Sequence, residues 1–334
     1  MNSPAPISLI VVSAVAIAGC SVSKKSSETV FAPEPYAFVV PDDLPSYTYF
    51  DTEQMTVQGV LLGEKLFSDP ILSKDDSVSC ASCHDPEKQF ADDRAFSEGV
   101  NGQTGDRNAP AIINPAWQKE FFWDGRAASL AEQALKPIAN KKEMALPLEE
   151  MVAKLQASPD YPQLFSRAFG SATVTAERTA NAIAQFEATL ISSDSKNDQV
   201  KRGEAEFTPE ELLGQEIFFS ERAECFHCHS GKLWMDQDYH DVGLDPEPAE
   251  GRFKVTGREA DRGKFKTPSL RNVALTGPWM HDGRFKTLRE VVEHYNSGVQ
   301  NSPNLDKLLQ NGKKLGLTDA EVDALVAFLK TLSN

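Results

Sequence analysis

Cysteine is scarce in this chain. Only five cysteines occur in 334 residues, at positions 20, 80, 83, 225 and 228. Four of them fall in two pentapeptides of the form C-x-x-C-H, at 80–84 and 225–229. Only Cys20 lies outside these motifs, and one cysteine cannot form a disulfide framework. The fold must therefore depend on packed hydrophobic cores. The length is sufficient for two domains with cores of their own.

The C-x-x-C-H pattern is the attachment signature of c-type haem. Its two thiols form thioethers with one porphyrin, and its histidine ligates the iron from the proximal side. A zinc site would need further thiol or imidazole ligands, and a redox dithiol has no use for the histidine. Two copies therefore predict two covalent c-type haems. The predicted attachment and proximal residues are Cys80, Cys83, His84, Cys225, Cys228 and His229.

An excess of positive charge is also lacking. The formal net charge is -15, before any haem propionates are added. This balance argues against nucleic acid or an anionic membrane surface as a partner. It suits docking of a basic protein electron donor, although a solvated acidic surface is the commoner explanation of such a charge.

No apolar run is long enough to span a bilayer comfortably, and the stretch Ile7–Gly19 is short. It ends in Ile17-Ala18-Gly19-Cys20, which resembles a bacterial lipobox, although Met1–Ser8 contains no Lys or Arg. We expect 1–19 to be a lipoprotein signal peptide and Cys20 to carry the lipid; an ordinary cleaved secretory signal is the alternative. The segment 20–48, rich in Ser, Pro and Glu, is expected to be a flexible tether. The expected location is the periplasm, with membrane contact only through the lipid anchor.

Alternating strand patterns are missing, whereas helical periodicity recurs. The spacing predicts a mainly α protein, and the predicted helices are Glu53–Phe67, Ser129–Leu135 (stopped before Pro137), Leu148–Gln156, Tyr161–Phe169, Ala176–Ile191, Leu288–Tyr295, and two that begin with capping boxes at Thr208–Glu211 and Thr318–Glu321. In the helix after Thr208, Leu212, Leu213, Ile217 and Phe218 are expected to face the core.

Similar passages precede the two haem motifs. Leu-Gly-Glu-Lys-Leu-Phe ends at Phe67, and Leu-Gly-Gln-Glu-Ile-Phe ends at Phe218. The chain is therefore interpreted as an internal duplication of a helix-then-haem unit. The charged stretch Asp194–Glu206 is interpreted as the connection, which gives an N-terminal haem domain over 49–200 and a C-terminal haem domain over 201–334.

Five stretches closely resemble the bacterial di-haem cytochrome c peroxidase family, which includes the MauG-type enzymes of methylamine utilisation. They are Ser79–Asp85, Arg107–Pro110, Phe122–Ala127, Leu130–Gln133 and Leu270–Thr276. The resemblance runs from Thr56 to Leu332. It implies two cytochrome-c-like helical domains with one haem each and a calcium ion between them. It also implies a cytochrome-c peroxidase that reduces hydrogen peroxide with electrons from a small redox protein, a cytochrome c or a cupredoxin. A homodimer is compatible with the resemblance.

The resemblance also assigns roles to single residues. The haem at His84 would be the peroxidatic one, with Glu143 and Gln133 in its distal pocket, and Trp123 would carry electrons between the haems. From composition alone, Glu143 and Gln133 would be exposed polar residues, and Trp123 a core aromatic. The calcium positions that match the family are Asn108, Thr276 and Pro278.

Two positions depart from the ordinary peroxidases. Val100 stands where those enzymes carry an iron-ligating histidine, so we expect the first haem to be five-coordinate. Tyr295 stands where a methionine ligates the second haem, and MauG-type enzymes use a tyrosine there. A core tyrosine fits the helical period equally well, and Met280, His281 and His294 are competing ligands.

Two alternative functions follow from these departures and from the haem count. The departures favour a MauG-like oxidase that modifies residues of a partner protein. A di-haem electron carrier without peroxidase activity is a further alternative, and it requires both irons to be six-coordinate.

Overall fold

Helices account for nearly all of the regular structure. The computed structural model describes residues 31–310 and 315–334. The helices are α1 (Val57–Ser68), α2 (Leu130–Ala139), α3 (Leu148–Ala157), α4 (Tyr161–Phe169), α5 (Ala176–Ala188), α6 (Lys196–Arg202), α7 (Pro209–Phe218), α8 (Cys225–Cys228), α9 (Phe253–Thr256), α10 (Leu288–Glu293) and α11 (Asp319–Lys330). The only described strands, β1 (Tyr239–His240) and β2 (Phe265–Lys266), form one antiparallel pair. The mainly α prediction is confirmed.

The predicted signal peptide and Cys20 lie outside the described residues. Within the described ranges, no helix is both long and apolar enough to cross a membrane.

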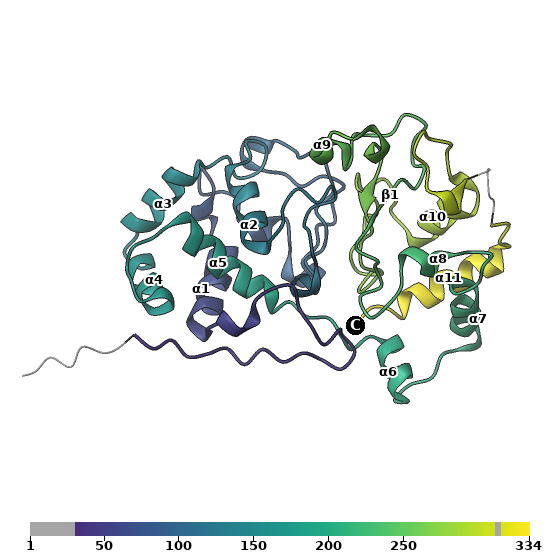
Figure 1. Ribbon diagram of the computed structural model, residues 1–334, viewed down its shortest axis with the longest axis horizontal. Coiled ribbons are helices and arrows are strands. Elements are labelled where there is room, and N and C mark those ends of the chain that lie inside the picture. Colours follow the sequence, from purple (N-terminus) through teal and green to yellow (C-terminus); the bar gives the residue numbers. More distant parts are fainter. Residues whose placement is uncertain (1–30, 311–314) are drawn as a thin grey trace, which may run out of the picture. The chain divides into compact units, whose positions relative to one another are not determined.

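Two helix pairs repeat the same packing, α1 on α5 and α7 on α11 (Figure 1). A Cβ atom placed on Gly63 of α1 would lie 1.9 Å from the carbonyl oxygen of Ala182. A Cβ atom on Gly214 of α7 would lie 1.9 Å from the carbonyl oxygen of Ala324. Only glycine permits such a close approach of two helix backbones. The duplication inferred from the sequence is therefore present in the packing, and each pair has its own hydrophobic core.

One detail of α2 and one detail of α7 differ from the predictions. Helix α2 does not stop before Pro137 but continues to Ala139, with Pro137 inside it. The amide of Asn140 donates to the carbonyl groups of Lys136 and Pro137, which closes the last turn. In α7 the buried stripe contains Gly214, Ile217 and Phe218, so Leu212 and Leu213 fall outside it and are 46% and 41% exposed.

Part of the segment expected to be a tether packs against the folded unit. Leu44 is 1% exposed. The indole nitrogen of Trp117 donates to the carbonyl of Pro45 at 2.9 Å, and Lys232 donates to the carbonyl of Asp42 at 2.6 Å. The apolar residues of this segment, which include Tyr36 and Phe38, explain why it packs rather than remaining solvated.

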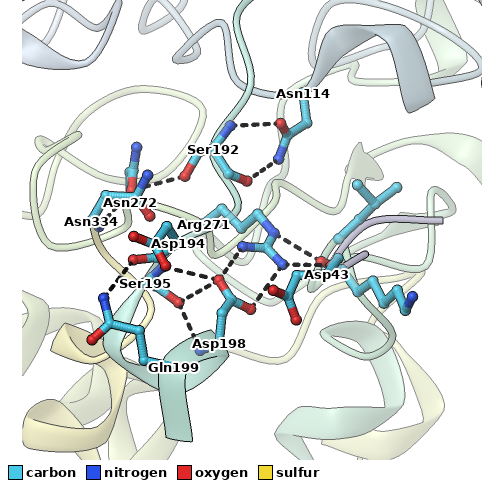
Figure 2. A network of polar contacts seen from close by, with 12 residues as sticks. Asp43, Asn114, Ser192, Asp194, Ser195, Asp198, Gln199, Arg271, Asn272 and Asn334 are labelled. Atoms are coloured by element: carbon cyan, nitrogen blue, oxygen red, sulfur yellow. Dashed lines mark hydrogen bonds and ion pairs between the residues drawn. The ribbon is translucent and has the colours of Figure 1, made fainter. Parts of the chain in front are cut away.

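The charged stretch expected to connect the halves contains α6 and a buried ion pair (Figure 2). Ser195 caps α6, and its hydroxyl donates to Asp198 at 2.8 Å. The guanidinium of Arg271, from the second half, donates to both carboxylate oxygens of Asp198 at 2.7 and 3.2 Å. Both side chains are 1% exposed. Burial alone would raise the pKa of Asp198, but the hydrogen bonds from Arg271 and Ser195 outweigh it and lower that pKa.

Replacing Asp198 by Asn is expected to reduce the free energy of unfolding by about 3 kcal/mol, because it leaves the buried Arg271 charge without a counter-ion. Because the folded-state pKa of Asp198 is lowered, its contribution is present above the usual aspartate pKa and is lost as pH falls through the folded value. Denaturant unfolding at several pH values should therefore show a smaller difference between variant and parent in acid. Asp194→Asn is the control: Asp194 is 68% exposed, so this variant should change stability by less than about 1 kcal/mol. Equal losses in both variants would contradict the assignment.

Candidate active site

A single cavity receives side chains from both haem motifs. It contains about 2910 Å³ of space that protein atoms do not fill, part of it open to solvent. Its walls include the motif residues Cys80, Cys83, His84, Cys225, Cys228 and His229. The structure therefore brings together all six residues that the motifs predicted for haem attachment and proximal ligation.

The two motif histidines are held in the same way. The Nδ1 atom of His84 lies 3.2 Å from the carbonyl oxygen of Phe90, and Nδ1 of His229 lies 3.2 Å from that of Trp234. A carbonyl oxygen can only accept, so Nδ1 carries the proton and Nε2 remains available as a metal ligand. Burial lowers the pKa of both imidazoles, which favours the neutral form that binds iron.

The cysteines of the motifs also suit thioether formation. All four described cysteines are free thiols, and each motif closes a tight turn in which the histidine amide donates to the carbonyl of the first cysteine. Burial raises the pKa of the Cys80 and Cys225 thiols above the ordinary cysteine value. Two thiols and one imidazole with a free Nε2 on each side of the cavity fit two covalent haems.

Glu143 and Gln133 reach the same cavity wall from one short region of chain. Gln133 lies on α2, and Glu143 lies in the loop that follows this helix. The amide of Asn140 donates to Oε1 of Glu143 at 2.6 Å. Burial raises the pKa of Glu143, and the hydrogen bond from Asn140 partly offsets this effect. Sequence reasoning missed Asn140, although Asn is a common residue of Asx turns, and here the amide of Lys142 donates to Oδ1 of Asn140 at 3.0 Å.

Val100 lies next to this loop but does not line the cavity. Its side chain is 1% exposed within the first core, and its amide donates to the carbonyl of Glu143 at 2.8 Å. The position therefore supports the backbone around Glu143. A valine side chain offers no iron ligand there.

Tyr295 lines the cavity on the side of the second motif. It lies in a π-helical turn, His294–Gly298, that directly follows α10, so the predicted regular helix through Tyr295 ends at Glu293. Such turns redirect side chains and often occur at functional sites. Burial raises the pKa of the Tyr295 phenol.

The three competing ligands are placed differently. Met280 and His281 also line the cavity. His294 does not, and its Nε2 atom lies 2.9 Å from the carbonyl oxygen of Val242. Because a carbonyl only accepts, this nitrogen carries a proton and is not available to a metal.

Trp123 connects the two halves of the chain. Its indole nitrogen donates to the carbonyl of Asn108 at 2.9 Å, and its own carbonyl accepts from the amide of Lys266 at 2.8 Å. Asn108, Thr276 and Pro278 line the cavity as well. The amide nitrogen of Asn108 donates to the carbonyl of Arg94 at 3.1 Å, which leaves its side-chain oxygen as a potential ligand for a hard cation.

Comparison with known proteins matches both halves to haem protein families. Residues 57–206 match the model of di-haem cytochrome c peroxidase, and residues 212–333 match that of cytochrome c. The cytochrome c551 peroxidase of Nitrosomonas europaea is 41% identical over 279 residues, which cover 81% of this chain and 79% of that protein. This chain belongs to the di-haem cytochrome c peroxidase family. It is therefore an oxidoreductase with two haems, and the predicted family and fold of two cytochrome-c-like domains are confirmed.

Relatives within the family carry two kinds of name. The methylamine utilization protein MauG of Methylophilus methylotrophus is 33% identical over 298 residues, which cover 88% of this chain and 87% of that protein. The crystal structure of a MauG-like protein associated with microbial copper homeostasis superposes with a TM-score of 0.81 at 33% identity, over 90% of this chain and 96% of that chain. Family membership alone therefore does not separate a peroxidase from a MauG-type oxidase.

Proposed function

We propose that this protein reduces hydrogen peroxide to water with electrons from a small redox protein, a cytochrome c or a cupredoxin. The observation that carries the proposal is the position of Glu143 and Gln133 on the wall of the cavity that also holds His84. A half-buried carboxylate and an amide beside a proximal histidine provide the proton transfer and orientation that peroxide cleavage requires.

The residues around the cavity divide the tasks. Cys80 and Cys83 would hold the first haem, and His84 would ligate its iron. Bound haem supplies a metal that takes up peroxide and delivers electrons to it. Glu143 would accept the proton from the peroxide oxygen nearer to the iron and donate it to the other peroxide oxygen. Gln133 would donate a hydrogen bond that orients the peroxide. The overall reaction consumes one peroxide, two electrons and two protons, and it forms two water molecules.

The second half is proposed to deliver the electrons. Cys225, Cys228 and His229 would hold the second haem, and Tyr295 is its proposed distal ligand. Trp123 is proposed to carry electrons between the halves, because hydrogen bonds join it to Asn108 and Lys266. The net charge of -15 favours a basic donor protein.

A second candidate function is oxidation of residues in a partner protein, which is the activity that the resemblance to MauG-type enzymes implies. Two features support it: the side chain of Val100 offers no iron ligand, and Tyr295 lines the cavity on the side of the second motif. A phenolate ligand favours ferric and higher oxidation states, which suits storing an oxidising equivalent rather than relaying electrons at high potential.

The resting ferric protein is expected to give one high-spin and one low-spin haem signal in electron paramagnetic resonance, because Val100 leaves the first iron open and Tyr295 closes the second. Turnover of peroxide with a reduced basic cytochrome c should then be rapid for the peroxidase. Two low-spin signals would contradict the open site and favour the electron carrier. A high-spin signal with negligible turnover would favour the oxidase.

Several further assignments are proposed with this function. The domain boundary lies near residue 200, consistent with the two family matches and two separate cores. One calcium ion binds at Asn108, Thr276 and Pro278, which metal analysis of the purified protein would test. The protein is periplasmic and carries a lipid on Cys20, which mass spectrometry of its N-terminal peptide would test. A homodimer is compatible with this function, and the mass in solution would decide it.

A further inference from the structure

Glu187 is a buried acidic residue that the proposed reaction does not use. It lies on α5, is 3% exposed and lines the cavity together with Cys80 and His84. Its Oε2 atom is buried without a hydrogen-bond partner among the described residues. A buried polar atom without a partner is rare, because its desolvation costs free energy that no hydrogen bond offsets.

The second helix pair, α7 and α11, shows which type of residue the packing alone requires at the position of Glu187. A Cβ atom placed on Gly63 would lie 1.9 Å from the carbonyl oxygen of Ala182 and 2.8 Å from Cβ of Phe186. A Cβ atom placed on Gly214 would lie at the same two distances from the carbonyl oxygen of Ala324 and Cβ of Phe328. Both helices also end alike: Thr189 donates through its hydroxyl to the carbonyl of Phe186 at 2.6 Å, and Thr331 donates to that of Phe328 at 2.6 Å. The residue that follows Phe186 is Glu187, and the residue that follows Phe328 is Leu329.

Leu329 is 7% exposed and belongs to the second hydrophobic core. The same packing is therefore built with a leucine in one half and with a glutamate in the other. A leucine is the cheaper choice for a buried position, since it has no polar atom to satisfy. The carboxyl group of Glu187 is thus not explained by folding.

Among the residues that the structure describes, no cation compensates the carboxyl group. The elements packed on α5 are α1, α2, α3 and the short turn Pro115–Trp117. Their charged side chains are either exposed or paired elsewhere, and they are Glu64, Lys65, Glu132, Lys136, Glu149, Glu150 and Lys154. The titratable group that faces it is the Cys80 sulfur, which a covalent haem would convert to a thioether. Burial therefore raises the pKa of Glu187 to about 8.

We propose that Glu187 is a proton-binding group of the first haem pocket, which takes up one proton from solvent when an electron enters this pocket and releases it when the electron leaves. An added electron and a carboxylate repel each other strongly in a cavity of low dielectric constant, and protonation removes that repulsion. The need for such a group follows from the proposed reaction: Glu143 only relocates a proton that peroxide already carries, whereas the two protons consumed must come from elsewhere.

This inference rests on the haem proposed at His84, and it does not require that peroxide is the substrate. The test uses the haem-loaded protein and the variants Glu187→Leu, which copies the second half, and Glu187→Gln, which keeps the shape without titrating. The midpoint potential of the first haem is measured against pH by spectroelectrochemistry, with the second haem as the internal reference. Thermal unfolding of each form is measured in parallel.

In the parent protein, the potential of the first haem should fall as pH rises through the pKa of Glu187, which burial raises above the ordinary glutamate value. That part of the dependence should be missing from both variants, while the second haem titrates as before. Glu187→Leu should also unfold at a higher temperature than the parent, and Glu187→Gln close to it. An unchanged pH dependence in both variants would overturn the proposal, and so would a lower unfolding temperature of Glu187→Leu with both haems attached.

The outcome is independent of the peroxidase assignment. If Glu143→Gln leaves the peroxide reaction unchanged, the proposed function fails, yet the potential of the first haem still reports on Glu187. If the peroxide reaction depends on Glu143 and the potential does not respond to Glu187, only the present inference fails.

Discussion

Replacing Glu143 by Gln is expected to slow the reaction with peroxide by about 10²- to 10⁴-fold, the usual contribution of a positioned acid–base group. Glutamine keeps the length and the polarity of the side chain but cannot accept a proton at neutral pH. Both haems should remain attached, because Glu143 contacts neither motif through any hydrogen bond in the described structure. Stopped-flow measurement of the haem absorbance after mixing with peroxide would give the rate. Glu149→Gln, an exposed change on the neighbouring helix α3, is the matched control.

The pH dependence adds a second readout for Glu143. The carboxylate form accepts the proton, so the rate should fall as pH drops through the pKa of Glu143. Because burial raises that pKa above the ordinary glutamate value of 4.5, the loss should begin at a higher pH than for an exposed glutamate. Asn140→Asp replaces the 2.6 Å donor by a second carboxylate, which should move this loss to still higher pH. A rate that is independent of both residues would remove Glu143 from the mechanism.

The sequence predicts those features that depend on local chemistry. Each C-x-x-C-H motif places two thiols and one imidazole at the cavity, because a single turn of local geometry suffices to bring these three groups together. The capping boxes at Thr208 and Thr318 mark the starts of α7 and α11 correctly, since a capping box satisfies backbone donors within a single turn. The equivalent passages before the two motifs predicted the duplication, and the structure adds that the packing at Gly63 is repeated at Gly214.

Features that depend on contacts distant in sequence were not predictable in this way. The partner of Asp198 is 73 residues away, so the charged stretch around it gave no sign of a buried ion pair. Leu212 and Leu213 satisfy the helical period, yet α11 covers only the face that contains Gly214. Glu187 looks like one more charged residue of an amphipathic helix until α5 is aligned with α11, where the same position is Leu329.

The π-helical turn at Tyr295 is another feature that the sequence did not predict, and it determines which side chain lines the cavity. A regular helix continued past Glu293 would rotate every later residue by the usual 3.6-residue period. The wider turn His294–Gly298 instead leaves His294 bonded to the carbonyl of Val242 and Tyr295 on the cavity wall. The helical period read from the sequence is also compatible with Tyr295 as a core residue. It therefore could not show that Tyr295 lies on the cavity wall.

Replacing Tyr295 by Met is therefore expected to raise the midpoint potential of the second haem by a few tenths of a volt, within the range of about 0.8 V that axial ligands span. A phenolate is a hard anionic donor that stabilises ferric iron, whereas a thioether is neutral and soft. Burial alone would keep the Tyr295 phenol protonated, so its ionisation requires the positive charge of a metal at the same place. Spectroelectrochemistry of the haem-loaded variant would measure the shift.

Tyr295→Phe is the variant that tests the ligation itself. Phenylalanine fills the same space without a donor atom, so the low-spin signal of the second haem should be lost or replaced. If its spectrum is unchanged, Tyr295 is not the ligand, and Met280 or His281 on the same wall takes that role. If ligation is established, turnover of Tyr295→Met separates the two candidate functions. A peroxidase should gain rate with a high-potential donor, because the second haem then accepts its electrons more readily. An oxidase should lose its ability to hold an oxidising equivalent, because the stabilising phenolate is gone.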